Sequence, residues 1–137
     1  MAYDCNHSSL FSPPSTQDHI QGRLNVSVML VMYGDNECFQ SAYTYRLIKV
    51  TQQQLSASFE ENGCKFICRH FPQVQIHPHA QRAAEAAEAA AAQGQVWQMH
   101  EMLFIHQQEL GNGNLVEYET QVWFLAEHLV DTPLVRS

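Results

Sequence analysis

Basic side chains are scarce in this sequence: seven Lys and Arg stand against fourteen Asp and Glu, a formal net charge of −7. No cluster of Lys and Arg offers the positive patch that binds phosphate backbones, so we expect no nucleic-acid partner. Long apolar runs are also missing. No segment approaches the roughly 20 apolar residues that span a bilayer, and the N-terminus has neither the basic start nor the apolar run of a signal peptide. We therefore expect a cytoplasmic protein without a membrane segment.

Cysteine is sparse, with four residues at Cys5, Cys38, Cys64 and Cys68. In a reducing cytosol such a set does not indicate a structural disulfide framework. Cys64 and Cys68 fall in one predicted strand, which would separate their Cα atoms by about 13 Å, beyond the reach of a disulfide. We interpret both as thiols without chemistry and place Cys5 in an irregular arm. The cysteine with a more informative position is Cys38.

The order of local sequence signals predicts a single α/β domain. The chain has 137 residues and is 45% hydrophobic, which is sufficient for one core. Strand, helix and strand within about 45 residues indicate a βαβ unit with parallel strands. Pro78 near the start and Gly94 after the end mark the strongest predicted helix, which lies within 77–94. The expected elements are an irregular arm over 1–19, a buried strand over 25–33, a helix over 38–55, a second strand over 64–71, and helices within 77–94, 95–110 and 115–130.

Cys38 stands where the first strand gives way to the first helix, in "YGDNECFQSAYTYR". The first turn of a helix has unpaired N–H groups and a partial positive charge, and both favour a thiolate over a thiol. Ser41 lies one turn further on, so its hydroxyl could donate a hydrogen bond to the sulfur. The negative charges of Asp35 and Glu37 oppose the thiolate. The alternative is that Cys38 is a small hydrophobic residue without reactivity.

Several histidines and tryptophans compete for a functional role. His70 follows the second strand, and the carboxyl ends of parallel strands share one edge, so His70 could stabilise a Cys38 thiolate or be a hydrogen-bonded structural histidine. His77 and His79 with His70 would suit zinc, but no recognised ligand spacing appears, and we expect no metal. The remaining candidates are expected to be solvated histidines and helix-layer tryptophans, namely His100, His106, Trp97 and Trp123.

Three blocks of the sequence share their order with one known family. They are "YGDNEC", "RHFP" and "HPHAQRAAEAAEAAAAQG". With the residues between them, from about Asp18 to about Tyr118, they resemble the DsbA-like thioredoxin family in its bacterial and cyanobacterial branch. The resemblance implies a thioredoxin-like βαβ core over 20–137 with a helical insertion over about 77–130. It also implies thiol–disulfide oxidoreductase activity through Cys38.

The sequence departs from that family in two places. The family's active site is Cys-x-x-Cys, whereas "CFQS" has Ser41 where the resolving cysteine belongs. No segment after residue 118 resembles the family's cis-proline strand, hairpin strand and closing helix, and only four residues follow Pro133. We therefore expect a C-terminally truncated domain. The strand over 25–33 would then have an open edge, which favours a homodimer through that edge.

The resemblance and the position of Cys38 together predict a monothiol protein thiol–disulfide oxidoreductase. Its partners would be protein or small-molecule thiols and disulfides. It would need no cofactor, with glutathione as the thiol co-substrate that replaces the missing resolving cysteine. The predicted catalytic residues are Cys38, Ser41 and His70. Two alternatives stay open: a catalytically silent binding module of the same fold, and a decayed, truncated copy without activity.

Overall fold

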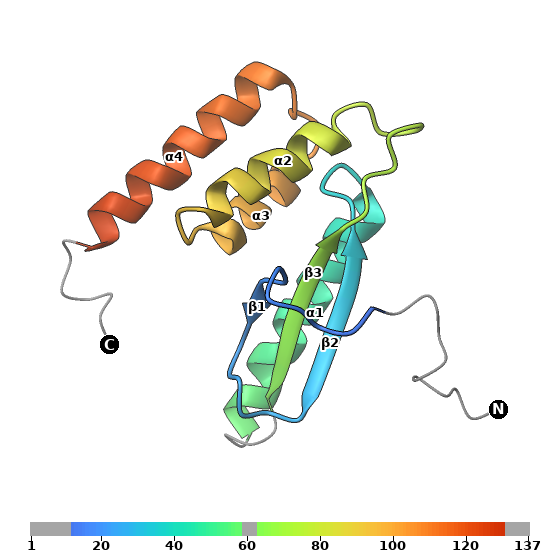
Figure 1. Cartoon of the computed structure of the whole chain (residues 1–137), viewed down its shortest axis with the longest axis vertical. Helices are drawn as coiled ribbons and strands as arrows, with labels where there is room; N and C mark the ends of the chain where they lie inside the picture. The colour runs from blue at the N-terminus through green and yellow to red at the C-terminus, as the bar shows by residue number, and fades with distance from the viewer. Residues whose placement is uncertain (1–11, 59–62, 131–137) are drawn as a thin grey trace.

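The computed structural model describes residues 12–58 and 63–130 of the chain. It contains four helices and three strands, and the last three helices follow the last strand (Figure 1). They are β1 (Ile20–Gln21), β2 (Val28–Gly34), α1 (Phe39–Ser58), β3 (Cys64–His70), α2 (Ala80–Ala91), α3 (Val96–Ile105) and α4 (Asn112–Val130). The expectations for Cys5, for Pro133 and for most of the arm over 1–19 concern residues outside these ranges.

The three strands form one mixed sheet in the order β1-β3-β2. β2 and β3 are parallel, with a register that runs from Val28 opposite Cys64 to Gly34 opposite His70. This confirms the predicted βαβ unit. β1 pairs antiparallel with the other edge of β3 and was not predicted, since a strand of two residues leaves no periodic signal.

Two hydrophobic clusters hold the domain together. α1 packs on one face of the sheet, and α2, α3 and α4 form a helical layer at the end of the sheet where β2 and β3 finish (Figure 1). The first cluster lies between sheet and α1 and contains Met32, Ala42, Tyr45, Phe66, Cys68 and Phe104. The second lies within the helical layer and contains Ala83, Ala86, Ala87, Ala90, Met99, Leu103, Leu110, Leu115, Tyr118 and Val122. α3 contributes to both, so it joins the helical layer to the sheet.

Alanine allows this close packing on α2. The buried alanines of α2 let the helix approach its neighbours closely, because a methyl side chain adds little to its radius. The helix begins after His79 and ends before Gly94, which has a φ of 73°. That left-handed conformation suits glycine and confirms the predicted stop signal.

Residues 12–19 cross the opposite face of the sheet (Figure 1). These residues have no helix or strand, as predicted, but they are held in place by Arg69 of β3. The Arg69 guanidinium donates to both carboxylate oxygens of Asp18, at 2.9 Å each, and to the carbonyl oxygen of Ser12 at 2.7 Å. It also donates to the hydroxyl of Tyr33 at 2.9 Å. The bidentate arginine thus fixes a segment that lacks backbone pairing.

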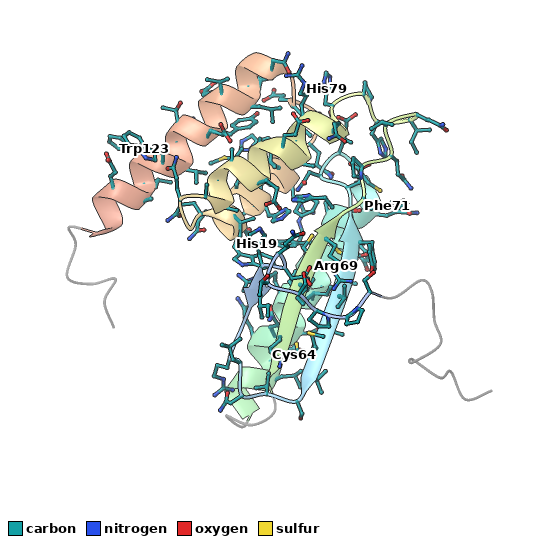
Figure 2. The ribbon with its side chains drawn as sticks, in the orientation of Figure 1. His19, Cys64, Arg69, Phe71, His79 and Trp123 are labelled. Atoms are coloured by element: carbon teal, nitrogen blue, oxygen red, sulfur yellow. The ribbon has the colours of Figure 1, made fainter. Side chains whose placement is uncertain are left out.

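Two helices expose apolar stripes. On α1 the buried stripe is Ala42 and Tyr45 with the half-buried Ile48, whereas four other apolar residues face outward: Phe39, Tyr43, Leu47 and Val50. On α4, Trp123 is 48% exposed on the outer side (Figure 2), so the expectation that it fills the helical layer was wrong. Three further apolar residues of α4 are exposed with it: Val116, Phe124 and Leu125.

The part of the chain after β3 is helical as far as it is described. Between residues 71 and 130 the structure contains α2, α3 and α4 and no further strand. None of the helices in the described ranges combines the length and the hydropathy that crossing a bilayer requires.

Candidate functional site

The loop between β2 and α1 is organised around the carboxylate of Asp35, which is 4% exposed. One carboxylate oxygen accepts the backbone N–H of Glu37 at 2.8 Å. The other accepts the backbone N–H of Gln73 at 2.9 Å and the ring Nδ1 of His77 at 2.8 Å. These donors compensate the buried charge. They also tie the loop before α1 to the segment that follows β3.

The same loop sets the position of Cys38. The backbone N–H of Cys38 donates to the carbonyl of Asp35 at 3.0 Å, and its carbonyl accepts the N–H of Ala42 at 3.2 Å. Cys38 is therefore the residue that caps the N-terminus of α1. A side chain at this position lies next to the unpaired N–H groups of the first helical turn. The predicted placement of the thiol at the helix N-terminus is thus observed.

Gly34 keeps the start of this loop compact. A Cβ atom added there would lie 2.8 Å from Cε of Met32 and 3.2 Å from Sγ of Cys68. The carbonyl oxygen of Gly34 accepts the N–H of Phe71 at 2.8 Å, which extends the pairing of β2 and β3 by one residue. Only glycine fits this point without moving the neighbouring side chains.

Cys38 and Ser41 line a common open hollow of about 420 Å³. One wall is the edge of β2, the second is the first part of α1, and the third is the segment after β3, where Phe71 lies near the start of α1 (Figure 2). The lining residues are Val31, Met32, Tyr33, Asp35, Cys38, Gln40, Ser41, Thr44, Phe71 and Gln73. The hydroxyl oxygen of Ser41 accepts the N–H of Asp35 at 3.1 Å, so its proton is available to another acceptor.

Residues of the helical layer also form hydrogen bonds with the loop between β2 and α1. The side-chain amide of Gln107 donates to the carbonyl oxygens of Asn36 at 3.0 Å and of Cys38 at 2.8 Å. The side-chain amide of Asn36 donates to Nδ1 of His100 at 2.9 Å. His100 is only 1% exposed, so the expectation that it is solvated was wrong. Burial, together with a smaller effect of the nearby His70, lowers the pKa of His100 to about 3, so the ring is neutral.

His70 lies in a separate cluster at the base of the helical layer. Its Nε2 donates to the carboxylate of Glu88 in α2 at 3.0 Å, and its ring stacks on His100 with centroids 5.4 Å apart. The second oxygen of the Glu88 carboxylate accepts Nε2 of His19 at 3.1 Å. His70 is not among the residues that line the hollow of Cys38. Its predicted effect on the thiolate stays a prediction.

The other histidines considered for a metal site bond to different groups. His77 bonds to Asp35, and the backbone N–H of His79 donates to Glu37 at 2.9 Å. The part of the chain that the structure describes brings no three His, Cys, Asp or Glu side chains into a metal-binding arrangement. His106 is partly exposed, and its ring stacks on Tyr118.

The cysteines of β3 contrast with Cys38. Cys64 and Cys68 are free and buried, whereas Cys38 is partly exposed. Burial raises the pKa of the Cys68 thiol to about 12, so it remains protonated at neutral pH. Of the cysteines described, Cys38 is therefore the most exposed residue.

Sequence reasoning missed the structural role of three polar residues around Cys38. Asp35 was considered for its charge alone, and Asn36 and Gln107 were not singled out. The signal for Asp35 lies in "YGDNEC", where an acidic residue follows a strand and precedes a helix. Its partners at residues 73–77 are distant in sequence, so only the fold reveals them.

Solved structures share this architecture. The crystal structure of a variant of *Wolbachia pipientis* alpha-DsbA1 matches with a TM-score of 0.58 and 16% identity, covering 83% of this chain and 56% of that chain. A second crystal structure of that protein matches with a TM-score of 0.54, covering 89% of this chain and 58% of that chain. The chain therefore has a DsbA-like, thioredoxin-like fold, with a partly exposed cysteine at the start of α1.

Comparison of the sequence with curated proteins finds Na(+)/H(+) antiporters. No family model matches the chain. It is 36% identical over 119 residues to the Na(+)/H(+) antiporter NhaA 3 of *Salinispora tropica*, covering 84% of this chain and 17% of the antiporter. It is 39% identical over 103 residues to NhaA 1 of *Mycolicibacterium vanbaalenii*, covering 74% of this chain and 16% of that protein. The chain thus spans about a sixth of the length of the curated relatives it matches.

Replacing Asp35 by Asn tests the role of its carboxylate. The amide has one acceptor oxygen, so its NH₂ group would face either the N–H of Glu37 or the donors of Gln73 and His77. We expect Asp35→Asn to lower the free energy of unfolding by about 2–3 kcal/mol, measured by urea unfolding. Glu37→Gln is the control, since a single amide oxygen can still accept the N–H of His79. Equal stability of the two variants would contradict this role.

The neutral, buried His100 predicts that the domain loses stability as the pH falls. An unfolded histidine has a pKa near 6.5, and burial lowers that of His100 to about 3. Between these values the unfolded chain binds more protons, so the free energy of unfolding decreases with decreasing pH. His70 adds to this with the same sign, because burial lowers its pKa as well.

We expect His100 alone to account for a loss of about 2 kcal/mol between about pH 8 and about pH 5. Urea unfolding across this range measures the slope. His100→Gln should reduce this slope, and His106→Gln, a partly exposed position beside α3, is the control for replacing a histidine. Parallel slopes for the two variants would show that His100 does not titrate as inferred.

Proposed function

We propose that the chain is a single-cysteine thiol–disulfide exchange domain, with Cys38 as its nucleophile. The observation that carries this proposal is the partly exposed Cys38 at the N-terminus of α1 in a DsbA-like fold. The unpaired N–H groups of the first helical turn favour a thiolate there. The cysteines of β3 are buried and therefore poor competitors for a disulfide substrate.

The local charges support this assignment better than the sequence alone suggested. Asp35 lies close to Cys38 in the chain, but its carboxylate is engaged by two backbone N–H groups and by His77. The Glu37 carboxylate accepts the N–H of His79. Both negative charges are thus partly compensated by donors, which reduces their opposition to a thiolate.

The exchange proceeds by displacement at sulfur. The Cys38 thiolate attacks one sulfur of a disulfide, a new disulfide joins Cys38 to that half of the substrate, and the other half leaves as a thiolate. Ser41 occupies the place of a resolving thiol and cannot carry out the second displacement. An external thiol such as glutathione then attacks the sulfur of the bound half, forms a new disulfide with it and releases Cys38 as a thiolate. We assign Ser41 the role of donating its free hydroxyl proton to the Cys38 sulfur.

Glutathione disulfide tests this mechanism directly. In a Cys5→Ser background, the folded chain should gain the mass of one glutathione, on Cys38, and the further variant Cys38→Ser should gain none. Ser41→Cys should convert the adduct to an internal disulfide, so that release no longer needs added thiol. This variant loses the acceptor of the Asp35 N–H, at a cost of about 1 kcal/mol. Intact mass spectrometry measures each species.

A folded chain without an adduct would contradict the exchange proposal. The control is the urea-unfolded chain, in which every cysteine should react with an alkylating reagent. Reaction only after unfolding would favour the catalytically silent binding module or the decayed copy instead.

A second function is favoured by the antiporter relatives. We propose that the chain serves as an accessory domain of a Na(+)/H(+) antiporter. The similar segment makes up about a sixth of those proteins, and its 36% identity to this chain extends over 119 residues. The described helices cannot cross a bilayer, so the segment would act beside the transport unit rather than as part of its membrane helices.

A chimera tests the accessory role. The *Salinispora tropica* antiporter would be expressed intact, without its similar segment, and with that segment replaced by this chain. We expect deletion to reduce Na⁺-driven proton exchange in everted vesicles, and the replacement to restore it. A further chimera with Cys38→Ser separates the two proposals, because a pure binding role does not need the thiol. Unchanged exchange after deletion would contradict an accessory role.

A further inference from the structure

Gln107 links the helical layer to the backbone around Cys38. It lies in the turn that follows α3, and its side chain is partly buried. Its amide donates to the carbonyl oxygen of Asn36 at 3.0 Å and to that of Cys38 at 2.8 Å. A glutamine amide has two N–H groups, and both are used here on the loop that precedes α1. One side chain thus holds two peptide groups of this loop.

The hydrogen bond to the Cys38 carbonyl also acts on the N–H at the other end of the same peptide group. That N–H belongs to Phe39, the first residue of α1. It is one of the first-turn N–H groups that have no partner within the helix and that favour a thiolate. A carbonyl that accepts a hydrogen bond polarises the N–H of its own peptide group, because linked hydrogen bonds strengthen one another. The Gln107 donor therefore increases the positive field at the start of α1.

The carbonyl oxygen of Cys38 keeps a partner without Gln107. It also accepts the backbone N–H of Ala42 at 3.2 Å. A carbonyl oxygen has two lone pairs, and the Gln107 amide takes the second. Loss of the Gln107 donor would therefore leave the start of α1 paired and would change mainly the electrostatics of the Cys38 peptide group. An effect on the thiol can thus be separated from an effect on folding.

Gln107 is not among the residues that line the hollow of Cys38. It lines a second hollow, of about 540 Å³, between the first half of α1 and the turn after α3. The ionisable side chains that line this second hollow are Glu37, Arg46, His106 and Glu109. The hollow of Cys38 contains the carboxylate of Asp35, which is bonded to His77. Any effect of Gln107 on the reaction of Cys38 must then pass through the backbone of the loop.

We propose that Gln107 is a positioning residue for the reaction of Cys38. Its amide orients and polarises the Cys38 peptide group, and so increases the fraction of the thiol that is ionised. This rests on the proposed thiol exchange and gives the helical layer a part in it. The turn after α3 tunes the sulfur through the backbone, without contact with the substrate.

The pH dependence of Cys38 alkylation by iodoacetamide tests this role. It is followed by intact mass spectrometry on the folded chain in a Cys5→Ser background, between about pH 5 and about pH 10. Gln107→Leu removes both donors. We expect the midpoint of the profile to rise by about 0.5 to 1 on the pH scale, so that alkylation below both midpoints slows about three- to tenfold. The limiting rate at high pH should stay within about threefold.

Gln108→Leu is the matched control, because it removes the neighbouring, exposed amide of the same turn. Its profile should coincide with that of the parent chain. Gln107→Lys keeps a donor at this position and adds a positive charge, so its midpoint should equal the midpoint of the parent or lie below it. A merely structural role would change the limiting rate or the free energy of unfolding and leave the midpoint in place.

An unchanged midpoint in a folded Gln107→Leu variant would overturn the positioning role, and the glutathione adduct of the parent chain would leave the exchange function standing. If circular dichroism shows that Gln107→Leu does not fold, Gln107→Lys decides, since a midpoint above that of the parent would overturn the role. A parent midpoint at or above the free-thiol value of about 8.5 would overturn it as well. A folded parent chain that forms no glutathione adduct would overturn the exchange function itself.

Discussion

The buried carboxylate of Asp35 is the constraint on which the site depends. A buried negative charge is costly unless donors surround it, and here the donors come from two separate segments. Glu37 belongs to the loop before α1, whereas Gln73 and His77 follow β3. The charge can be satisfied only when β2 and β3 are paired and both segments have taken their places. Formation of the βαβ unit and positioning of Cys38 are therefore one event.

α3 carries this constraint to the helical layer. Phe104 packs in the sheet cluster, while Met99 and Leu103 pack in the helical cluster. The side-chain amide of Gln107, just after α3, donates to the carbonyl oxygen of Cys38. His100 of α3 accepts a hydrogen bond from the side-chain amide of Asn36. A change in the helical layer thus reaches the thiol through hydrogen bonds to the backbone around it. The helices are part of the site's support even though they contribute no sulfur.

Local signals made the central elements predictable. The apolar run before "GDNE", the Ala-rich segment and its stop at Gly94 fixed the parallel strands and α2, and the position of Cys38 followed from them. The failures concern choices that only tertiary contacts decide. α1 has two apolar stripes, and spacing does not say which one the sheet covers. His100 is buried because Asn36, far away in sequence, supplies a donor to its ring. The fold was thus more predictable than the polar network of the site.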